Sequence, residues 1–168
     1  MNTESKILEE LYRCYYNAAM LYCLSLSHDR SISEDLVAEA FVKAYLSLPD
    51  RIPSFQFWLF RVCRNLWIDH IRRSKHQTLY EIPEDLPDCS TPETRYLANE
   101  RQIALWNAIR TLSPQDQELV TLHYFSGMPL TEVAQLLDTT YPAVRQRMVR
   151  LRATLRQRLE EQGYGTES

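Results

Sequence analysis

Apolar side chains recur along most of this chain at steps of three and four residues, the spacing that places them on one face of an α-helix. Only three of the 168 residues are glycine, and β-branched and polar residues nowhere alternate long enough to form a strand. The sequence therefore predicts an all-α protein. The first apolar stripe comprises Ile7, Leu8, Leu11, Tyr15, Ala18, Ala19, Tyr22 and Leu26.

Breaks in this periodicity predict three helices in the first half of the chain. The segment SHDRSISE interrupts the first stripe, and Ser31 followed by Glu34 has the spacing of a capping box that opens a second helix. Prolines 49 and 53 are expected to end that helix. A third helix from Phe55 is apolar on nearly every side, so it is either sandwiched or presents an apolar face to a partner. The second helix is expected to bury Leu36, Ala40, Phe41, Ala44 and Leu48.

Composition and cysteine spacing limit the class of protein. The chain is 45% apolar and 24% charged, as folded globular domains are, and it has neither a run of about 18 apolar residues nor a leader. We therefore expect a cytoplasmic protein. The four cysteines occur singly, which argues against a disulfide scaffold. Cys63, His70 and His76 do not share a helical face, so no metal site and no cofactor are expected.

A proline-containing acidic stretch, HQTLYEIPEDLPDCSTPE, separates two helical parts. It predicts two small helical domains at 1–76 and 92–162, with a linker at 77–91 and a tail at 163–168. In the second domain, a helix is expected to start at the Thr91–Pro92 cap and run to Ser113. Ser113 followed by proline then opens another helix, with Leu119, Leu122 and Tyr124 on it, and Gly127 closes that helix.

Residues 130–159 have the pattern of a helix-turn-helix motif. A short helix with Val133, Ala134 and Leu137 inward is followed by a turn at DTTY and by a longer helix. The pattern alone is not specific for DNA binding, because helical hairpins are common.

The longer helix has two contrasting faces when its residues are placed 100° apart. Its predicted core arc comprises Val144, Met148, Leu151, Leu155 and Leu159. The opposite arc comprises Pro142, Gln146, Val149, Arg150, Ala153 and Gln157. Six arginines and no acidic residue lie between positions 139 and 159. A merely solvated helix usually interleaves such charges with glutamate, so the pattern favours a nucleic-acid partner.

Two blocks of the sequence resemble the sigma-70 superfamily, specifically its extracytoplasmic-function (ECF) branch, which has only sigma domains 2 and 4. The first is SEDLVAEAFVKAYLSL followed by FWLFRVCRNLWIDHIRR, and the second is AIRTLSPQDQELVTLHYFSGMPLTEVAQLLDTTYPAVRQRMVRLRATLR. The resemblance implies a region 2 helical bundle and a region 4 helix-turn-helix. It also implies an alternative-type sigma factor that binds core RNA polymerase, recognises minus-10 and minus-35 promoter elements, and promotes transcription initiation.

The resemblance assigns expected roles to named residues. Asp35, Glu39 and Lys43 are the expected core polymerase docking residues, whereas Leu36 and Phe41 of the same helix are expected to pack in the core. The residues expected to capture the minus-10 strand are Ser54, Phe55, Gln56 and Asn65. Trp58 also matches the family helix, but a plain core tryptophan is the alternative. Those expected to read minus-35 bases are Tyr141, Arg145, Gln146, Val149 and Arg150. Those expected to contact phosphates are Thr140, Arg147, Arg152 and Arg156.

The chain departs from the family pattern in three places. Ala38 replaces a frequent glutamine in the docking helix, and the loop between positions 48 and 58 is shorter than usual and lacks glycine. Pro142 replaces a frequent glycine at the start of the reading helix, which is expected to hold Tyr141 extended.

The expected partners are core RNA polymerase, through its clamp helices and flap, promoter DNA and an anti-sigma factor, with the free protein a monomer. The formal charge of −3 fits weak DNA binding by the free chain. A stand-alone helix-turn-helix regulator, with residues 1–76 as a dimerisation or effector domain, is the alternative. An enzyme is not expected, because no glycine-rich phosphate loop, HExxH or GxSxG motif occurs in the sequence.

Overall fold

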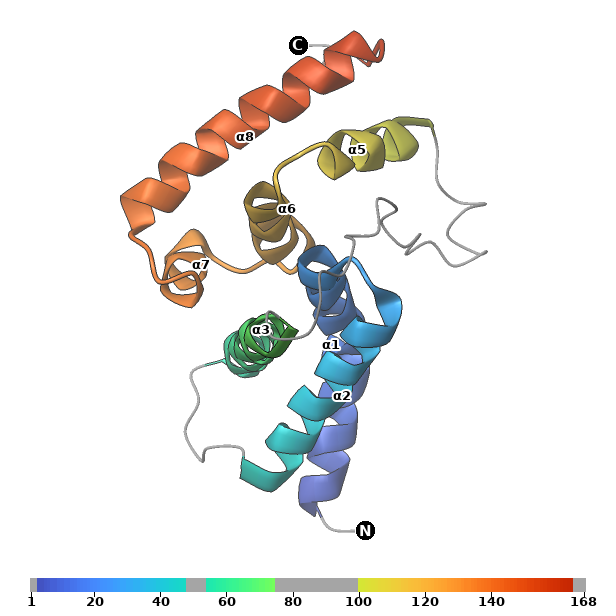
Figure 1. Cartoon of the computed structure of the whole chain (residues 1–168), viewed down its shortest axis with the longest axis vertical. Helices are drawn as coiled ribbons and strands as arrows, with labels where there is room; N and C mark the ends of the chain where they lie inside the picture. The colour runs from blue at the N-terminus through green and yellow to red at the C-terminus, as the bar shows by residue number, and fades with distance from the viewer. Residues whose placement is uncertain (1–2, 48–53, 75–99, 165–168) are drawn as a thin grey trace. The chain divides into compact units, whose positions relative to one another are not determined.

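The computed structural model describes residues 3–47, 54–74 and 100–164, and these residues form helices joined by short connections, with no strand among them (Figure 1). The chain divides into two compact units, Met1–Pro87 and Asp88–Ser168. The all-α class expected from the sequence is therefore confirmed.

The first unit is a bundle of three helices, α1 (Thr3–Ser27), α2 (Arg30–Ser47) and α3 (Phe55–Ser74). Each helix packs against the other two. At the centre, the ring of Tyr22 from α1 stacks on Phe60 from α3, with centroids 5.0 Å apart, and both side chains are fully buried. Helix α3 buries Leu59, Phe60, Cys63 and Leu66 against its two neighbours, and its other apolar side chains are half-buried, so the choice between a sandwiched helix and a partner-facing one stays open.

The connection between α1 and α2 differs from the expected capping box. His28 adopts a positive φ of 53°, and the carboxylate of Asp29 accepts a hydrogen bond of 2.9 Å from the backbone N–H of Ile32. Asp29 is thus the helix cap, and Ser31 is an exposed residue of the first turn. The prediction was wrong by two residues because the left-handed turn at His28 starts the helix earlier.

The start of α3 agrees with the sequence. Ser54 accepts a 3.3 Å hydrogen bond from the backbone N–H of Phe57, so it acts as the N-cap of this helix. The end of α2 at Ser47 is consistent with a stop before Pro49, although Leu48 and both prolines lie outside the described residues.

The second unit comprises α5 (Glu100–Arg110), α6 (Pro114–Val120), the π-helix η1 (Thr121–Phe125), α7 (Leu130–Leu136) and α8 (Tyr141–Glu161). Helix α8 packs against α5 and α7. Ser113 accepts a 3.2 Å hydrogen bond from the Asp116 N–H, which confirms it as the cap of α6. The helix before it ends at Arg110 rather than Ser113. The expected cap at positions 91–92 and the linker at 77–91 lie outside the described residues.

The helix expected between Ser113 and Gly127 changes type before it ends. Its last turn is the π-helix η1, in which the Ser126 N–H donates to the Thr121 carbonyl at 3.0 Å. Tyr124, expected on the helix with the inward leucines, is 47% exposed. Gly127 has the positive φ of 66° that its expected role as C-terminal cap requires.

Helices α7 and α8 form the expected helix-turn-helix. Val133 and Ala134 are buried on α7, and residues 137–140 connect it to α8. Asp138 makes the turn with a positive φ of 51°, and Thr140 is the extended residue before α8. None of the described helices is both long and apolar enough to cross a membrane.

Candidate nucleic-acid and polymerase interfaces

Helix α8 exposes the arc that the sequence assigns to DNA. Val144, Met148 and Leu151 are buried, with at most 3% of each exposed, and Leu155 and Leu159 are half-buried. The predicted core arc is therefore confirmed. All six residues of the opposite arc are exposed: Pro142, Gln146, Val149, Arg150, Ala153 and Gln157.

The five expected base-reading residues all lie on the exposed side of α8: Tyr141, Arg145, Gln146, Val149 and Arg150. Val149 is 59% exposed, and Arg145 and Arg150 have no side-chain partner within the described part of the chain. Tyr141 was expected to be extended, but it is the first residue of α8, and Thr140 takes the extended conformation instead. The helix starts there because the Thr140 hydroxyl accepts a 3.3 Å hydrogen bond from the Ala143 N–H.

The four expected phosphate-contacting residues lie in four different environments. The Thr140 hydroxyl caps α8. The Arg147 Nε–H donates to the Asp116 carboxylate at 2.7 Å, and the same guanidinium donates to the Gln115 side-chain oxygen at 2.8 Å. The Arg152 Nε–H donates to the Tyr124 hydroxyl at 2.5 Å. Arg156 is exposed and has no partner among the described residues.

The expected docking residues form one exposed charged stripe on α2. Asp35, Glu39 and Lys43 are spaced four residues apart, and all three side chains are exposed. Leu36 and Phe41 of the same helix are 5% and 7% exposed, which confirms their expected place in the core.

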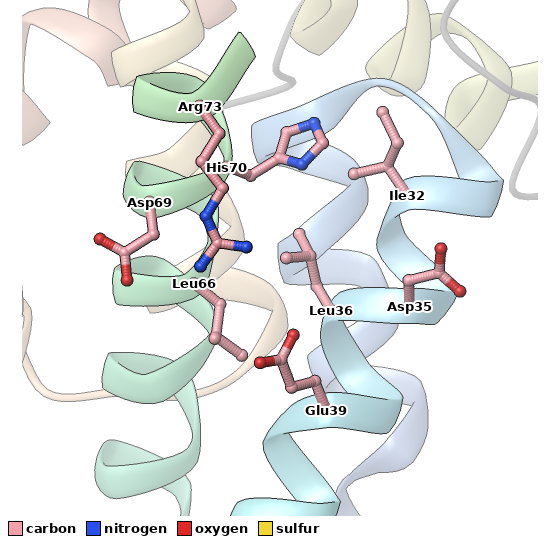
Figure 2. A pocket seen from close by; sticks show the side chains of 8 residues that line it. All are labelled: Ile32, Asp35, Leu36, Glu39, Leu66, Asp69, His70 and Arg73. Carbon is pink, nitrogen blue, oxygen red and sulfur yellow. The ribbon is translucent and has the colours of Figure 1, made fainter.

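Helix α3 adds charges beside this stripe that the sequence did not indicate as part of it. A small pocket of about 120 Å³ lies between α2 and α3 (Figure 2). Arg73 of α3 and Glu39 of α2 both extend into the space between the two helices. The lining residues are Ile32, Asp35, Leu36, Glu39, Leu66, Asp69, His70 and Arg73. The four-residue spacing of Asp69 and Arg73 was the available signal, but their place in a pocket shared with α2 required the tertiary structure.

A second, apolar groove of about 630 Å³ runs along α1 and α2, and the sequence did not predict it. Tyr45 and Leu46 are 70% and 73% exposed there. Ala38, the residue that replaces a frequent glutamine, lies in this groove. The apolar lining comprises Tyr12, Tyr16, Ala38, Phe41, Val42, Tyr45 and Leu46.

The expected minus-10 residues are spread along α3. Asn65 is exposed on α3, but it follows Gln56 by nine residues, which corresponds to about 13 Å along a helix axis. Ser54 caps α3, and the Phe55 ring packs 5.4 Å from Tyr15. Asn65 and residues 54–56 therefore lie at two different levels along α3.

Phe55 and Trp58 pack against each other at the start of α3. Phe55 also lies 6.0 Å from the ring of Trp58, and both side chains are half-buried. Trp58 is thus neither a fully buried core tryptophan nor an exposed one.

The cysteines are placed as core residues. Cys23 and Cys63 are fully buried on α1 and α3, and a hydrogen bond with the Cys63 thiol, together with burial, raises the pKa of Cys23. No group of three or more metal-ligating side chains occurs in the described ranges, and His76 lies outside them.

Comparison with known proteins assigns both units. The family model for Sigma-70 region 2 matches residues 11–77, and that for Sigma-70, region 4 matches residues 102–155. The chain is 33% identical over 153 residues to the probable RNA polymerase sigma factor RfaY of Xanthomonas campestris pv. campestris; the match covers 85% of this chain and 38% of that protein. The present chain therefore spans well under half the length of RfaY.

A shorter relative matches along nearly its whole length. The ECF RNA polymerase sigma factor SigM of Bacillus subtilis is 27% identical, with 89% of this chain and 93% of SigM covered. The fold is similar to that of the sigma factor RpoE in its solved complex with the anti-sigma factor NepR from Bartonella quintana. The TM-score is 0.69 at 21% identity, covering 92% of this chain and 98% of that one. With region 2 matched in the first unit and region 4 in the second, the chain belongs to the sigma-70 family, in its extracytoplasmic-function branch.

Proposed function

We propose that this chain is an alternative-type sigma factor that binds core RNA polymerase, recognises minus-10 and minus-35 promoter elements and promotes transcription initiation. The observation that supports this most strongly is the pairing of two different charged surfaces in one chain. One unit exposes the acidic positions of a docking helix, and the other exposes an arginine-rich helix that follows a tight turn.

In this proposal α8 enters the major groove at the minus-35 element. Arg150 and Arg145 can donate two hydrogen bonds to a guanine edge, and Val149 offers an apolar surface to a thymine methyl group. Gln146 suits an adenine edge, and Tyr141 stands at the helix start, near the expected phosphate contact Thr140. The exposure of these side chains and the burial of the opposite arc support this orientation.

The docking stripe is the proposed contact with the polymerase clamp helices. Asp35 and Glu39 offer carboxylates, and Lys43 follows on the same face. Charges at a contact surface chiefly determine the encounter rate and the choice of partner. Losing them should therefore weaken and slow polymerase capture.

The minus-10 role is proposed for the exposed part of α3 and for the start of that helix. The exposed side-chain amide of Asn65 can pair with the edge of an unstacked base. Ser54, Phe55 and Gln56 then serve a separate position of the strand, about 13 Å away along the helix.

We also propose that the domains extend over residues 1–76 and 92–162 and that the second unit contacts the polymerase flap. The protein is further proposed to be a monomeric cytoplasmic factor that uses no cofactor and is not an enzyme. An anti-sigma partner is proposed because RpoE, whose fold is similar, was solved in complex with one.

Run-off transcription with purified core polymerase tests the proposal. The template is the upstream region of the chain's own gene, with several further candidate promoters. We expect specific initiation that requires this chain. The double variant Asp35→Asn/Glu39→Gln should lose most of it, whereas the charge-matched Glu10→Gln/Glu160→Gln should not, because those exposed acids lie outside the docking stripe.

No specific start on any promoter would overturn the proposal. Tight binding by the free chain to two-fold symmetric sites, independent of polymerase, would favour a stand-alone helix-turn-helix regulator instead.

A further inference from the structure

Two arginines of α8 donate hydrogen bonds to side chains of the helices that precede it, and the two acceptor groups differ in charge. Arg147 is held by the Asp116 carboxylate at 2.7 Å. Arg152 is held by the Tyr124 hydroxyl, a neutral group, at 2.5 Å. A carboxylate neutralises a guanidinium, whereas a phenol orients it and leaves its charge intact.

We propose that Tyr124 and Arg152 form a clamp for one phosphate of the DNA backbone, in which Tyr124 is the positioning residue. The inference rests on the proposed function, because it takes α8 as the helix that meets DNA. The Tyr124 oxygen accepts the Arg152 Nε–H, so Tyr124 acts through Arg152, whose terminal guanidinium N–H groups remain to be donated to phosphate oxygens.

The hydrogen bond orients the arginine and places its guanidinium carbon 5.8 Å from the centroid of the Tyr124 ring. Holding this long side chain in one conformation reduces the entropy that it would otherwise lose on binding. Both side chains are exposed, so a phosphate can reach them.

Tyr124 is in turn supported by the π-helix η1. The His123 ring meets the Tyr124 ring edge-on, with centroids 5.1 Å apart and planes at 63°. His123 Nδ1 lies 2.8 Å from the Met128 carbonyl, so this nitrogen is the donor of that hydrogen bond. The hydrogen bond to Met128 therefore fixes the His123 ring, and the Tyr124 ring packs against it.

Arg147 is the internal contrast. Its charge is compensated by Asp116, and Gln115 occupies a further donor at 2.8 Å. Its side chain joins α8 to the start of α6. We therefore expect Arg147 to add little to the salt dependence of DNA binding, unlike Arg152.

The test is a double-variant cycle with Tyr124→Phe and Arg152→Ala in the full chain. Binding to an arbitrary DNA duplex is measured at several low salt concentrations, and binding to promoter DNA is measured with core polymerase added. Tyr124→Phe keeps the ring and removes only the hydroxyl, and thermal unfolding checks that the fold is intact. Tyr12→Phe is the matched control, since that tyrosine is also exposed but lies on α1, in the other unit.

We expect Tyr124→Phe to weaken binding about 3- to 10-fold, the range for one hydrogen bond, and equally for all DNA sequences. Arg152→Ala should lower the slope of log K against log salt by about one. In the Arg152→Ala background, the tyrosine change should have no further effect.

Unchanged affinity in Tyr124→Phe, or an equal loss with and without Arg152, overturns the clamp even if polymerase-dependent initiation is normal. A coupled loss on arbitrary duplex without any promoter preference in the presence of core polymerase supports the clamp and overturns the proposed function. The two failures are thus distinguishable.

Discussion

Helices α3 and α8 carry the two sets of expected DNA contacts, and they are nearly equal in length, 20 and 21 residues. Helix α3 packs against both α1 and α2, and four of its residues are buried while most of the others are half-buried. Helix α8 buries only Val144, Met148 and Leu151 and exposes most of its remaining surface.

The difference explains why the outward face of α8 was known from the sequence and that of α3 was not. A helix with a single narrow apolar arc has only one way to pack, so its opposite face is known from the sequence. A helix that is apolar on nearly every side has no unique outward face. The neighbours of α3 therefore decide which side chains are available, and they leave Asn65 exposed.

The largest expected effect concerns the cores that hold the two helices. Phe60→Ala should destabilise the first unit by about 3–5 kcal/mol, because it empties a fully buried site beside Tyr22. Met148→Ala should cost the second unit about 2–5 kcal/mol. Urea unfolding followed by circular dichroism and tryptophan fluorescence should resolve which transition moves.

Each substitution should move only the transition of its own unit, and exposed Val149→Ala should stay within about 0.5 kcal/mol. If both transitions move together in either variant, the units unfold as one, and the two helices cannot be compared as independent parts.

The next effect sharpens the assignment of α8. Arg150→Ala should lose about 1–3 kcal/mol of promoter binding at one base pair and relax the preference there, since an exposed arginine without a side-chain partner among the described residues suits a base contact. Affinities of polymerase bearing the variant for a set of single-base promoter changes measure this. Arg156→Ala is the control and should weaken all sequences alike; a uniform loss in Arg150→Ala would reassign that residue to a phosphate.

A smaller effect addresses α3. Asn65→Ala should reduce strand opening by about 1 kcal/mol, the scale of one hydrogen bond, without changing the affinity for closed duplex. Permanganate reactivity of unpaired thymines reports the opening, and Asn17→Ala, an exposed asparagine of α1, serves as the control. A loss confined to the duplex-binding step would contradict the minus-10 role.

The smallest expected effect is a pH dependence of the stability of the first unit that the second unit should not share. Burial lowers the pKa of His28, so the unfolded chain binds more protons than the folded unit below about pH 6.5. The first unit should therefore lose stability as pH falls through that value, until the lower folded pKa is passed. The variant His28→Asn tolerates the positive φ of 53° and should remove this part of the pH dependence.

Urea midpoints of both transitions between pH 7.5 and pH 5 measure the effect. The wild type and His28→Asn should differ in slope for the first unit only, and equal slopes would show that His28 does not contribute.

The sequence by itself determined the features that depend on residues close together in the chain. Helical periodicity predicted the all-α class and both faces of α8, the side chain of Ser113 predicted the cap of α6, and Gly127 predicted the positive φ that ends η1. The two sequence blocks also identified the family. Each of these signals lies within a few turns of a helix, or in a motif that can be read directly.

Only the tertiary structure decided which distant residues meet. Tyr124 and Arg152 are 28 positions apart, and Asp116 and Arg147 are 31 apart. Periodicity determines the faces of one helix, whereas the packing of two helices determines which of those faces touch, and in this chain that packing gives one arginine a carboxylate and the other a phenol.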